Sequence, residues 1–461
     1  MSRSKLLVFI DADVVVRHFL DSGAFSELPD VYDVVLIFPP ADWKRLVNSP
    51  DIDRWGFRAR RIEIPQPRRM LFKQLFFIDQ ARHRRDPEWR DIRKGWITMI
   101  RWKAGVLFSL LALPLVRQFA NACVLRRLKA IPATEFLALL DDERPDILMH
   151  PSTFEGYFVN DLLDVACARN IPMMLLMNSW DNPSLKRSAV GVPDAVVVWG
   201  EQTRRHTEKF MAVPPERIHV LGAAQFQVFR DPPVRTRDEI CAINRIAPTQ
   251  HVLLYAGSSK GNREPVHLRW LNEAIECGLL EGVTVLYRPH PYGIAAADAR
   301  DILEGRLPHV VIEHGMRGFL EEVANGRNQG FRITPYSETH DLLNAVDAVI
   351  SPLSTILIEA GLHGKPMICF IPQEEDDNTY WKVLRDLVHF RELLQHPKIL
   401  VARTHSEFLP AAQILISRIS DEAEAQEVKK SMHFFVDFPE QRYSFAIKNL
   451  VDSLLGVRST Q

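Results

Sequence analysis

The sequence predicts two α/β domains, each built on a parallel β-sheet covered by helices on both faces. Short apolar runs of four to seven residues alternate with helical patterns along most of the chain. The runs are continuous rather than alternating, which is typical of parallel strands buried on both faces. The length of 461 residues is about three times that of a typical domain, so two domains, or two with an insertion, are expected.

Twelve apolar runs place the predicted strands in order. Repeated strand–helix units imply right-handed crossovers and therefore doubly wound sheets. The first domain contains the runs LLVFI, DVVLIF, ILMH, MMLLM, AVVVW and IHVLG, and the second contains HVLLYAG, VTVLYR, HVVIE, FRIT, AVIS and MICFI. Residues 230–237, RDPPVRTR, are rich in proline and charge and predict a linker. We expect an N-terminal domain over residues 1–232 and a C-terminal domain over residues 247–432.

Composition excludes several classes of protein. The net charge of −1 argues against a nucleic-acid partner. Five scattered cysteines without metal-ligand spacing predict reduced thiols in a cytoplasmic protein, with no disulfide framework and no zinc site. The longest apolar stretch, residues 105–116, is shorter than the ~20 residues of a membrane span and contains Pro114, so no transmembrane helix is expected. Asp11 and Asp13 interrupt the first apolar run, which favours a strand over a signal peptide.

A basic insertion is predicted in the first domain over about residues 66–130. Residues 68–129 contain 15 Lys/Arg and 4 Asp/Glu, a local net charge of +11. Basic charge beside apolar side chains suits an anionic membrane surface or a lipid-phosphate acceptor. The alternative is a helical insertion that packs its aromatic side chains into the first domain and leaves its arginines in solvent. The aromatic residues concerned are Phe72, Phe76, Phe77, Trp89, Trp96, Trp102 and Phe108.

The most informative motif is residues 347–371, DAVISPLSTILIEAGLHGKPMICFI. Ser354 or Thr355 stands at the N-cap position before a helix that contains Glu359. A helix N-terminus offers unpaired N–H groups and a positive dipole end, so it suits a phosphate. Glu359, one turn further on, is placed to accept hydrogen bonds from a ribose diol. The alternative is an ordinary strand–helix turn with a good cap.

Two further turns follow strands of the same predicted sheet. Gly257, Ser258, Ser259 and Lys260 form a glycine- and serine-rich turn that would bring backbone N–H groups to a phosphate. In RPHPYG, Arg288 and His290 follow the next strand, and a histidine there can donate to a phosphate or nucleotide. The alternative is a histidine that caps a proline-rich turn. Tyr336 comes next in chain order and is predicted to flank the base or sugar.

These motifs resemble those of GT-B glycosyltransferases, which have two Rossmann-like domains facing across a cleft. Residues Ser354, Thr355 and Glu359 match the family's Ser/Thr turn and ribose glutamate, and Gly364 and Pro366 match the closing Gly-x-Pro. The His290-Pro291 pair is similar to that of bacterial surface-polysaccharide and CDP-glycerol-type transferases. The resemblance implies that residues 433–461 form a helix that crosses back to the first domain.

The first domain would supply the acceptor site and, in an inverting enzyme, a general base. Three carboxylates follow predicted strands, and each also has a structural alternative as a helix cap or backbone acceptor. They are Glu155, Asp13 and Asp181.

The sequence therefore predicts a glycosyltransferase that moves a sugar or sugar-like group from a nucleotide-activated donor to a surface-polysaccharide or lipid-linked acceptor. Its place would be the cytoplasm, with contact to the inner membrane surface through residues 66–130. No cofactor beyond the nucleotide sugar is expected, and the lack of a DxD pattern predicts no essential metal. Two alternatives stay open: an enzyme like UDP-GlcNAc 2-epimerase, and a non-catalytic nucleotide-binding subunit.

Overall fold

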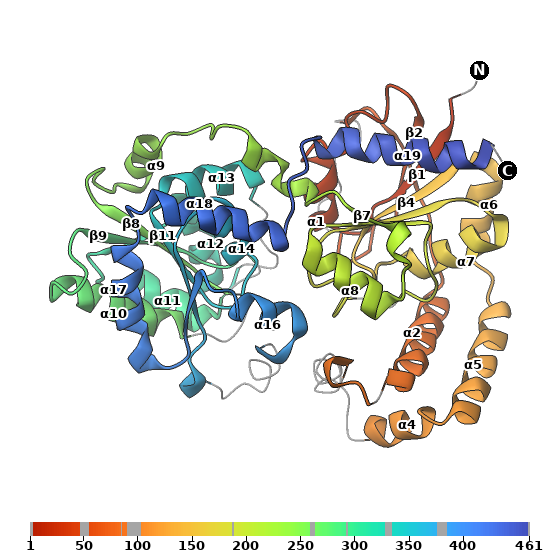
Figure 1. Cartoon of the computed structure of the whole chain (residues 1–461), viewed down its shortest axis with the longest axis horizontal. Coiled ribbons are helices and arrows are strands. Elements are labelled where there is room, and N and C mark those ends of the chain that lie inside the picture. The colour runs from red at the N-terminus through yellow and green to blue at the C-terminus, as the bar shows by residue number, and fades with distance from the viewer. Residues whose placement is uncertain are drawn as a thin grey trace. The chain divides into compact units, whose positions relative to one another are not determined.

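The computed structural model describes residues 3–46, 55–83, 85–89, 103–186, 189–258, 263–291, 294–327, 334–375 and 385–459. The chain divides into two compact units, shown in Figure 1. Unit 1 comprises Met1–Gln227 and Phe434–Gln461, and unit 2 comprises Val228–His433. The division falls near the predicted boundaries at 232 and 433.

Unit 1 is built on a parallel sheet that has seven strands in the described part of the chain, in the order β3-β2-β1-β4-β5-β6-β7. Six of these strands match the six apolar runs. The edge strand β3 was missed because its sequence, RARR, is charged and mostly exposed. The strands are β1 (Lys5–Phe9), β2 (Asp33–Phe38), β3 (Arg58–Arg61), β4 (Ile147–Ser152), β5 (Met173–Met177), β6 (Ala195–Val198) and β7 (Ile218–Val220).

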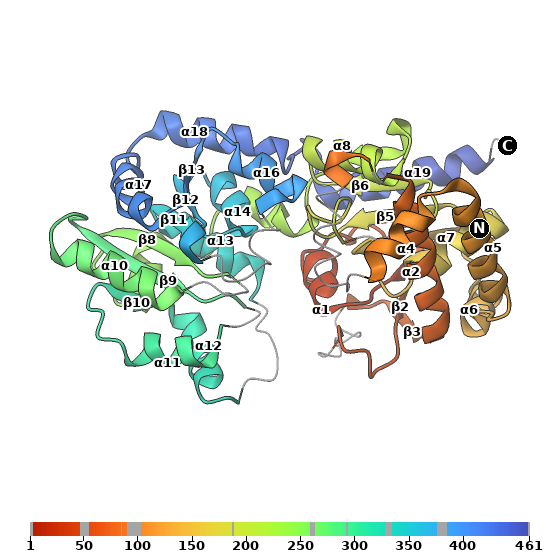
Figure 2. The same cartoon turned by 90° about the horizontal axis from the view of Figure 1, so that it is seen from below.

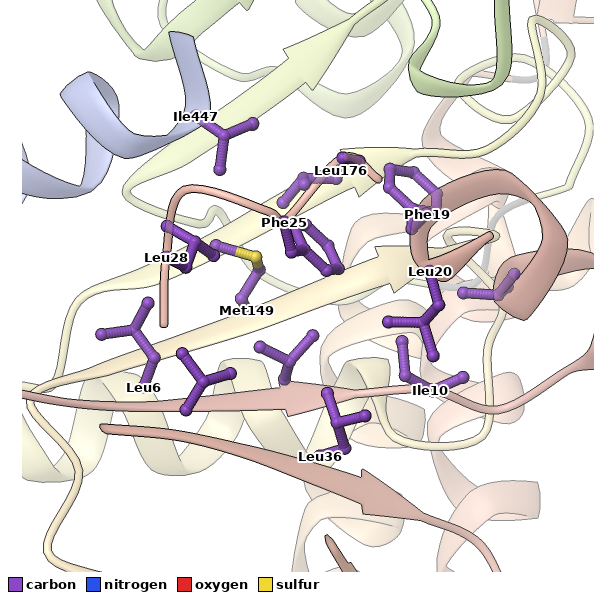
Figure 3. Packing of buried hydrophobic residues seen from close by; sticks show 14 of the residues in the cluster. Leu6, Ile10, Phe19, Leu20, Phe25, Leu28, Leu36, Met149, Leu176 and Ile447 are labelled. Atoms are coloured by element: carbon purple, nitrogen blue, oxygen red, sulfur yellow. The ribbon is translucent and has the colours of Figure 1, made fainter. Parts of the chain in front are cut away.

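The main helices of unit 1 are α1 (Asp13–Val15), which continues as a π-helix over Val16–Leu20, α6 (Thr134–Glu143), α7 (Val159–Arg169), α8 (Glu201–Met211) and α19 (Tyr443–Ser459). Helix α19 comes from the far end of the chain. Its residues Tyr443, Ile447 and Val451 are buried in the same core cluster as the side chains of β1, β2 and β4. Figure 3 shows Ile447 pointing toward this cluster, which includes Phe25, Met149 and Leu176.

The basic insertion forms helices α2 (Gln66–Gln80), α4 (Lys103–Leu111) and α5 (Pro114–Lys129). Proline is favoured in the first turn of a helix, and Pro114 begins α5, so the apolar stretch 105–116 is divided between two helices. The three helices share a small core of their own. Its buried residues are Leu71, Phe72, Leu75, Ile78, Ala81, Phe108, Leu111, Val124 and Leu128.

Most of the aromatic side chains counted in the insertion are internal. Phe72, Phe76, Trp89 and Phe108 are buried. The indole of Trp89 stacks on His83 and meets Phe210 of α8 edge-on. Trp96 and Trp102 lie outside the described residues. In the part of the insertion that the structure describes, the aromatic rings therefore mainly build the fold.

Unit 2 contains the second parallel sheet, six strands within the described residues, in the order β10-β9-β8-β11-β12-β13. Strand β13 was not predicted. The predicted strand FRIT falls on residues 331–333, outside the described residues, and on Thr334, which belongs to no strand. The strands are β8 (His251–Ala256), β9 (Val283–Arg288), β10 (Val310–Ile312), β11 (Ala348–Ser351), β12 (Met367–Phe370) and β13 (Ile399–Ala402).

The helices of unit 2 that bear on the site are α9 (Arg237–Asn244), α10 (Glu264–Glu276), α13 (Tyr336–Ala345), α14 (Ile356–Leu362), α16 (Val388–Leu394) and α17 (His405–Ser417). The stretch predicted as a linker is held on this unit. The Val234 amide donates to Asp341, and Arg237 makes two hydrogen bonds to the Asp347 carboxylate, of 3.0 and 2.8 Å. The C-terminal half of the predicted linker is thus a structural part of unit 2.

Candidate functional sites at the strand ends

Each sheet has one point where the strand order reverses. In unit 2 the chain adds β9 and β10 on one side of β8 and then returns to add β11 on the other. In unit 1 the same reversal lies between β1 and β4. Ligands of open α/β sheets bind outside the carboxyl ends of the strands at such reversals. The predicted donor and acceptor residues follow these strands.

The turn after β8 is organised by a buried acid that sequence reasoning missed. Glu264, the first residue of α10, accepts hydrogen bonds from the Ser258 amide (2.9 Å) and the Tyr287 hydroxyl (2.6 Å). Burial raises the pKa of Glu264 to about 7. The Gly257 amide donates to the Arg288 carbonyl (2.9 Å). Both described amides of the predicted phosphate turn are therefore already paired within the protein.

The glycine in this turn has a packing reason. A Cβ at position 257 would lie 2.6 Å from an oxygen of Glu264, so only glycine fits against the carboxyl group. Ser259 and Lys260, the other two residues predicted here, lie outside the described residues.

The turn after β9 presents the predicted Arg288 and His290. The Arg288 guanidinium donates through Nη2 to Thr334 (2.8 Å) and Thr339 (3.2 Å), whereas its buried Nη1 has no hydrogen-bond partner among the described residues. Burial, with the nearby charge of Arg288 as a second cause, lowers the pKa of His290 to about 4. His290 is therefore neutral at pH 7, with one ring nitrogen able to donate and the other to accept.

The turn after β11 carries Ser354 and Thr355, both partly exposed at the start of α14. Thr355 is the N-cap residue, but its hydroxyl makes no capping hydrogen bond. Glu359 is 7% exposed, and its backbone carbonyl accepts a hydrogen bond from His363 (2.7 Å). The hydroxyl of Ser351, at the end of β11, is buried and makes no hydrogen bond to any of the residues described.

The remaining predicted donor residue, Tyr336, begins α13 on the same unit and meets the ring of Phe229 edge-on. Because β9, β8 and β11 are parallel neighbours, the three turns that follow them lie together at the carboxyl ends of these strands. The structure thus brings Gly257, Ser258, Arg288, His290 and Thr355 to the same end of the sheet.

Beyond β12 and β13 the same unit has a basic cavity of about 350 Å³. Among the described residues that line it, three carry a guanidinium group and one carries a carboxylate, which suits an anionic group. The lining residues are Gln373, Arg385, Asp386, Arg391, Leu394, Gln395 and Arg403. Sequence reasoning missed this cavity because its arginines are scattered over 19 positions and the strand before Arg403 was not recognised.

At the reversal point of unit 1, Asp11 is the organising residue. Its carboxylate accepts hydrogen bonds from the Ser152 hydroxyl and from the Tyr157 amide (2.6 Å). His150 donates through Nδ1 to the Phe9 carbonyl (3.1 Å), and its buried Nε2 has no hydrogen-bond partner in the part of the chain that the structure describes. Burial lowers the pKa of His150, although the Asp11 charge opposes this. A Cβ at Gly156 would lie 2.6 Å from both Asp11 Oδ2 and His150 Nε2.

The three predicted bases differ in accessibility. Asp13 is 4% exposed and Asp181 is 8% exposed, and Asp181 pairs with Lys186 (2.9 Å). The Glu155 side chain is 28% exposed and lies 3.7 Å from Arg45. A base has to reach an acceptor hydroxyl, so Glu155 has the most open position of the three. The hydrogen bonds of Asp11 to Ser152 and Tyr157, and of His150 to Phe9, join residues more than 140 positions apart, so the sequence did not reveal them.

Among the described residues, no group of three or more His, Cys, Asp or Glu side chains is arranged to hold a metal ion. In that same part of the chain, no helix combines the length and the apolar character needed to cross a bilayer.

Comparison with known proteins gives the fold. The sequence matches no family model and no curated protein. The chain is similar to UDP-GlcNAc 2-epimerase from Neisseria meningitidis bound to UDP-GlcNAc, with a TM-score of 0.53, 11% identity and coverage of 98% of this chain and 100% of that one. It is also similar to a glycosyltransferase from Rickettsia africae, with a TM-score of 0.51, 8% identity and coverage of 100% of both chains. A third similar structure is the calicheamicin glycosyltransferase CalG4, with a TM-score of 0.50, 13% identity and coverage of 98% of this chain and 99% of that one.

At such identities the likeness establishes the architecture: two parallel-sheet α/β domains of the GT-B type. The predicted fold class is confirmed. The narrower likeness to CDP-glycerol-type transferases, drawn from the His-Pro pair, stays a prediction.

Proposed function

We propose that the chain is a GT-B glycosyltransferase that takes a nucleotide-activated sugar in unit 2. The observation that carries the proposal is the set of side chains at the carboxyl ends of the central strands of the second sheet, where the strand order reverses. Arg288, neutral His290 and the open start of α14 follow neighbouring strands there. A guanidinium and a neutral imidazole suit phosphate oxygens and a nucleotide. The architecture is shared with the structure of UDP-GlcNAc 2-epimerase bound to UDP-GlcNAc.

Within this proposal each group has a role. Arg288 and the hydroxyls of Ser354 and Thr355 neutralise phosphate charge, which stabilises the nucleotide as it leaves. Glu359 accepts hydrogen bonds from the ribose. In unit 1, Glu155 takes the proton from the acceptor hydroxyl, which then attacks the anomeric carbon while the nucleotide departs. Asp13 and Asp181 are the other candidates for this proton transfer. No metal or further cofactor is required.

The acceptor is proposed to be a surface polysaccharide or a lipid-linked glycan. The strongly basic insertion supports this choice, since such acceptors or the membranes that hold them carry negative charge. The enzyme would then act in the cytoplasm at the inner membrane surface.

The donor site is tested by titrating purified Glu359→Gln with UDP, CMP and CDP. Loss of a charge-assisted hydrogen bond should weaken binding of the cognate nucleotide by about 1–3 kcal/mol, and thermal shift or calorimetry would measure this. Glu276→Gln, on an exposed position of α10, is the matched control and should bind as the wild type does. Equal affinity in Glu359→Gln and wild type would remove Glu359 from the site.

An epimerase is the second candidate, supported by the shared architecture with UDP-GlcNAc 2-epimerase. It predicts that UDP-GlcNAc is converted without any acceptor. A transferase predicts turnover only when acceptor is added. Nucleotide binding with neither reaction, and no effect of replacing Glu155, Asp13 and Asp181, would point to a non-catalytic subunit.

A further inference from the structure

Helices α4 and α5 expose an unusual amount of apolar surface. Eight large apolar side chains on this pair and its connection are each more than a third exposed, and Leu115 (81%) and Phe119 (73%) are the most exposed of them. All except Leu125 lie within residues 106–119, around the turn between the two helices. We call these seven the α4–α5 face: Val106, Leu107, Leu110, Leu113, Leu115, Val116 and Phe119. Figure 1 shows α4 past the ends of α2 and α5, away from the strands of the unit 1 sheet, and Figure 2, which looks from below, draws α4 in front of that sheet.

This face is separate from the one that these helices use for folding. Phe108 and Leu111 of α4, and Val124 and Leu128 of α5, are buried in the core shared with α2. The opposite side of each helix therefore needs no apolar residues for packing. Single exposed apolar side chains are common on soluble proteins, but a contiguous set at the corner of a helix pair marks an interaction surface.

The charge around the face has one sign. Residues 103–130 contain five basic residues and no acidic one. Arg126, Arg127 and Lys129 are exposed and have no salt-bridge partner within the described part of the chain. On α5, Leu115, Phe119, Arg126 and Lys129 follow the spacing i, i+4, i+11 and i+14, so they share one stripe, with the apolar end at the α4 turn and the basic end two turns further on.

We propose that the α4–α5 face docks on an anionic lipid bilayer, with its apolar side chains entering the interface between headgroups and acyl chains and its basic side chains contacting the headgroups. An anionic bilayer satisfies both features at once. A second copy of the chain is disfavoured because a symmetric contact would bring the same unpaired positive charges together. The proposal goes beyond the donor chemistry, since it depends on no nucleotide-binding residue.

The test is flotation of the full-length protein with vesicles of phosphatidylcholine alone and of phosphatidylcholine mixed with phosphatidylglycerol. The wild type should float with the anionic vesicles, and less as salt is raised. The double variant Leu115→Ser, Phe119→Ser should lower the vesicle partition coefficient by about tenfold or more. The triple variant Arg126→Gln, Arg127→Gln, Lys129→Gln should lower it by a similar factor on anionic vesicles and leave neutral vesicles unaffected.

The matched controls are Val234→Ser and Phe445→Ser, which remove exposed apolar side chains elsewhere and should partition as the wild type does. The midpoint of thermal unfolding and the nucleotide affinity should be unchanged in all these variants. The flotation result therefore does not depend on whether the proposed donor site is correct. Wild type that stays with the soluble fraction at low salt, or a double variant that floats equally well, would overturn the proposal. A dimer in light scattering that is lost in the double variant would assign the face to a second copy instead.

Discussion

Glu264 shows how a single buried carboxyl group can organise a turn. It accepts from the Ser258 amide and the Tyr287 hydroxyl, and its oxygens occupy the space that a side chain at position 257 would need. The group joins the end of β8, the end of β9 and the start of α10. A carboxyl group in such a site is better tolerated neutral than ionised, because burial removes the water that would solvate the charge.

The raised pKa of Glu264 predicts a pH dependence of stability. The folded state holds the proton up to about pH 7, whereas the unfolded chain releases it near 4.5. Between these values the folded state binds more protons, so the free energy of unfolding falls as pH rises, by about 3 kcal/mol in all, and is level above pH 7. Denaturant unfolding between pH 4.5 and 8 measures this contribution.

Glu264→Gln supplies the comparison, since the amide mimics the protonated acid. The variant should lose this part of the pH dependence and be more stable than the wild type at pH 8. Glu273→Gln, at an exposed position of the same helix, should follow the wild-type curve. Parallel curves for Glu264→Gln and wild type would show that Glu264 is ionised in the folded protein.

At the scale of elements, the basic insertion is held to the first unit by one buried ion pair. Arg68 of α2 donates to Asp161 of α7 and, at 2.9 Å each, to Asp164 and to the Ile131 carbonyl. Burial raises the pKa of Asp161, so the carboxylate depends on the guanidinium beside it. Arg68 is only 6% exposed, unlike most of the basic side chains that the structure describes in the insertion. One arginine of this segment is therefore structural.

Arg68→Leu should destabilise unit 1 by about 3–5 kcal/mol, because it leaves Asp161 buried and unpaired. Adding Asp161→Leu should recover part of that loss. The control is Arg82→Leu, which breaks an exposed pair with Asp79 and should cost less than about 1 kcal/mol. Thermal unfolding would measure all three, and equal losses for Arg68→Leu and Arg82→Leu would contradict the assigned role.

At the scale of the whole molecule, the chain passes through unit 2 and returns. The last helix, α19, supplies Tyr443, Ile447 and Val451 to the core of unit 1. The Tyr32 hydroxyl donates a hydrogen bond to the Asp452 carboxylate, which links the residue just before β2 to the same helix. Unit 1 is thus complete only when residues more than 400 positions apart meet.

Ile447→Ala should destabilise unit 1 by about 2–5 kcal/mol, because Ile447 is fully buried and the variant leaves a cavity. Hydrogen exchange should rise in β1 and β2 and stay unchanged in β8 and β9. Phe445→Ala removes a 45% exposed side chain from the same helix and should alter neither set. Faster exchange in both units would mean that α19 is not specific to unit 1.

Much of the fold follows from local pattern. Continuous apolar runs identified eleven of the strands, because a strand buried on both faces needs apolar side chains at every position. The charged edge strand β3 escaped because it is mostly exposed, so the pattern does not apply to it. Strand β13 escaped as a short run, ILVA, in a stretch with no other motif.

The candidate site residues, like the strands, were predicted from the sequence only in part. Residues at the end of a strand or within four positions after it, such as Arg288, His290 and Thr355, were found from the sequence because the end of a parallel strand is a local signal. Which of them pair was decided only by tertiary structure: the partner of Ser258 is six positions away on another element, and that of Asp11 is 146 positions away. The burial and the pKa of each side chain, and the exposure of the α4–α5 face, depend on which other residues pack against them. No local sequence pattern carries that information.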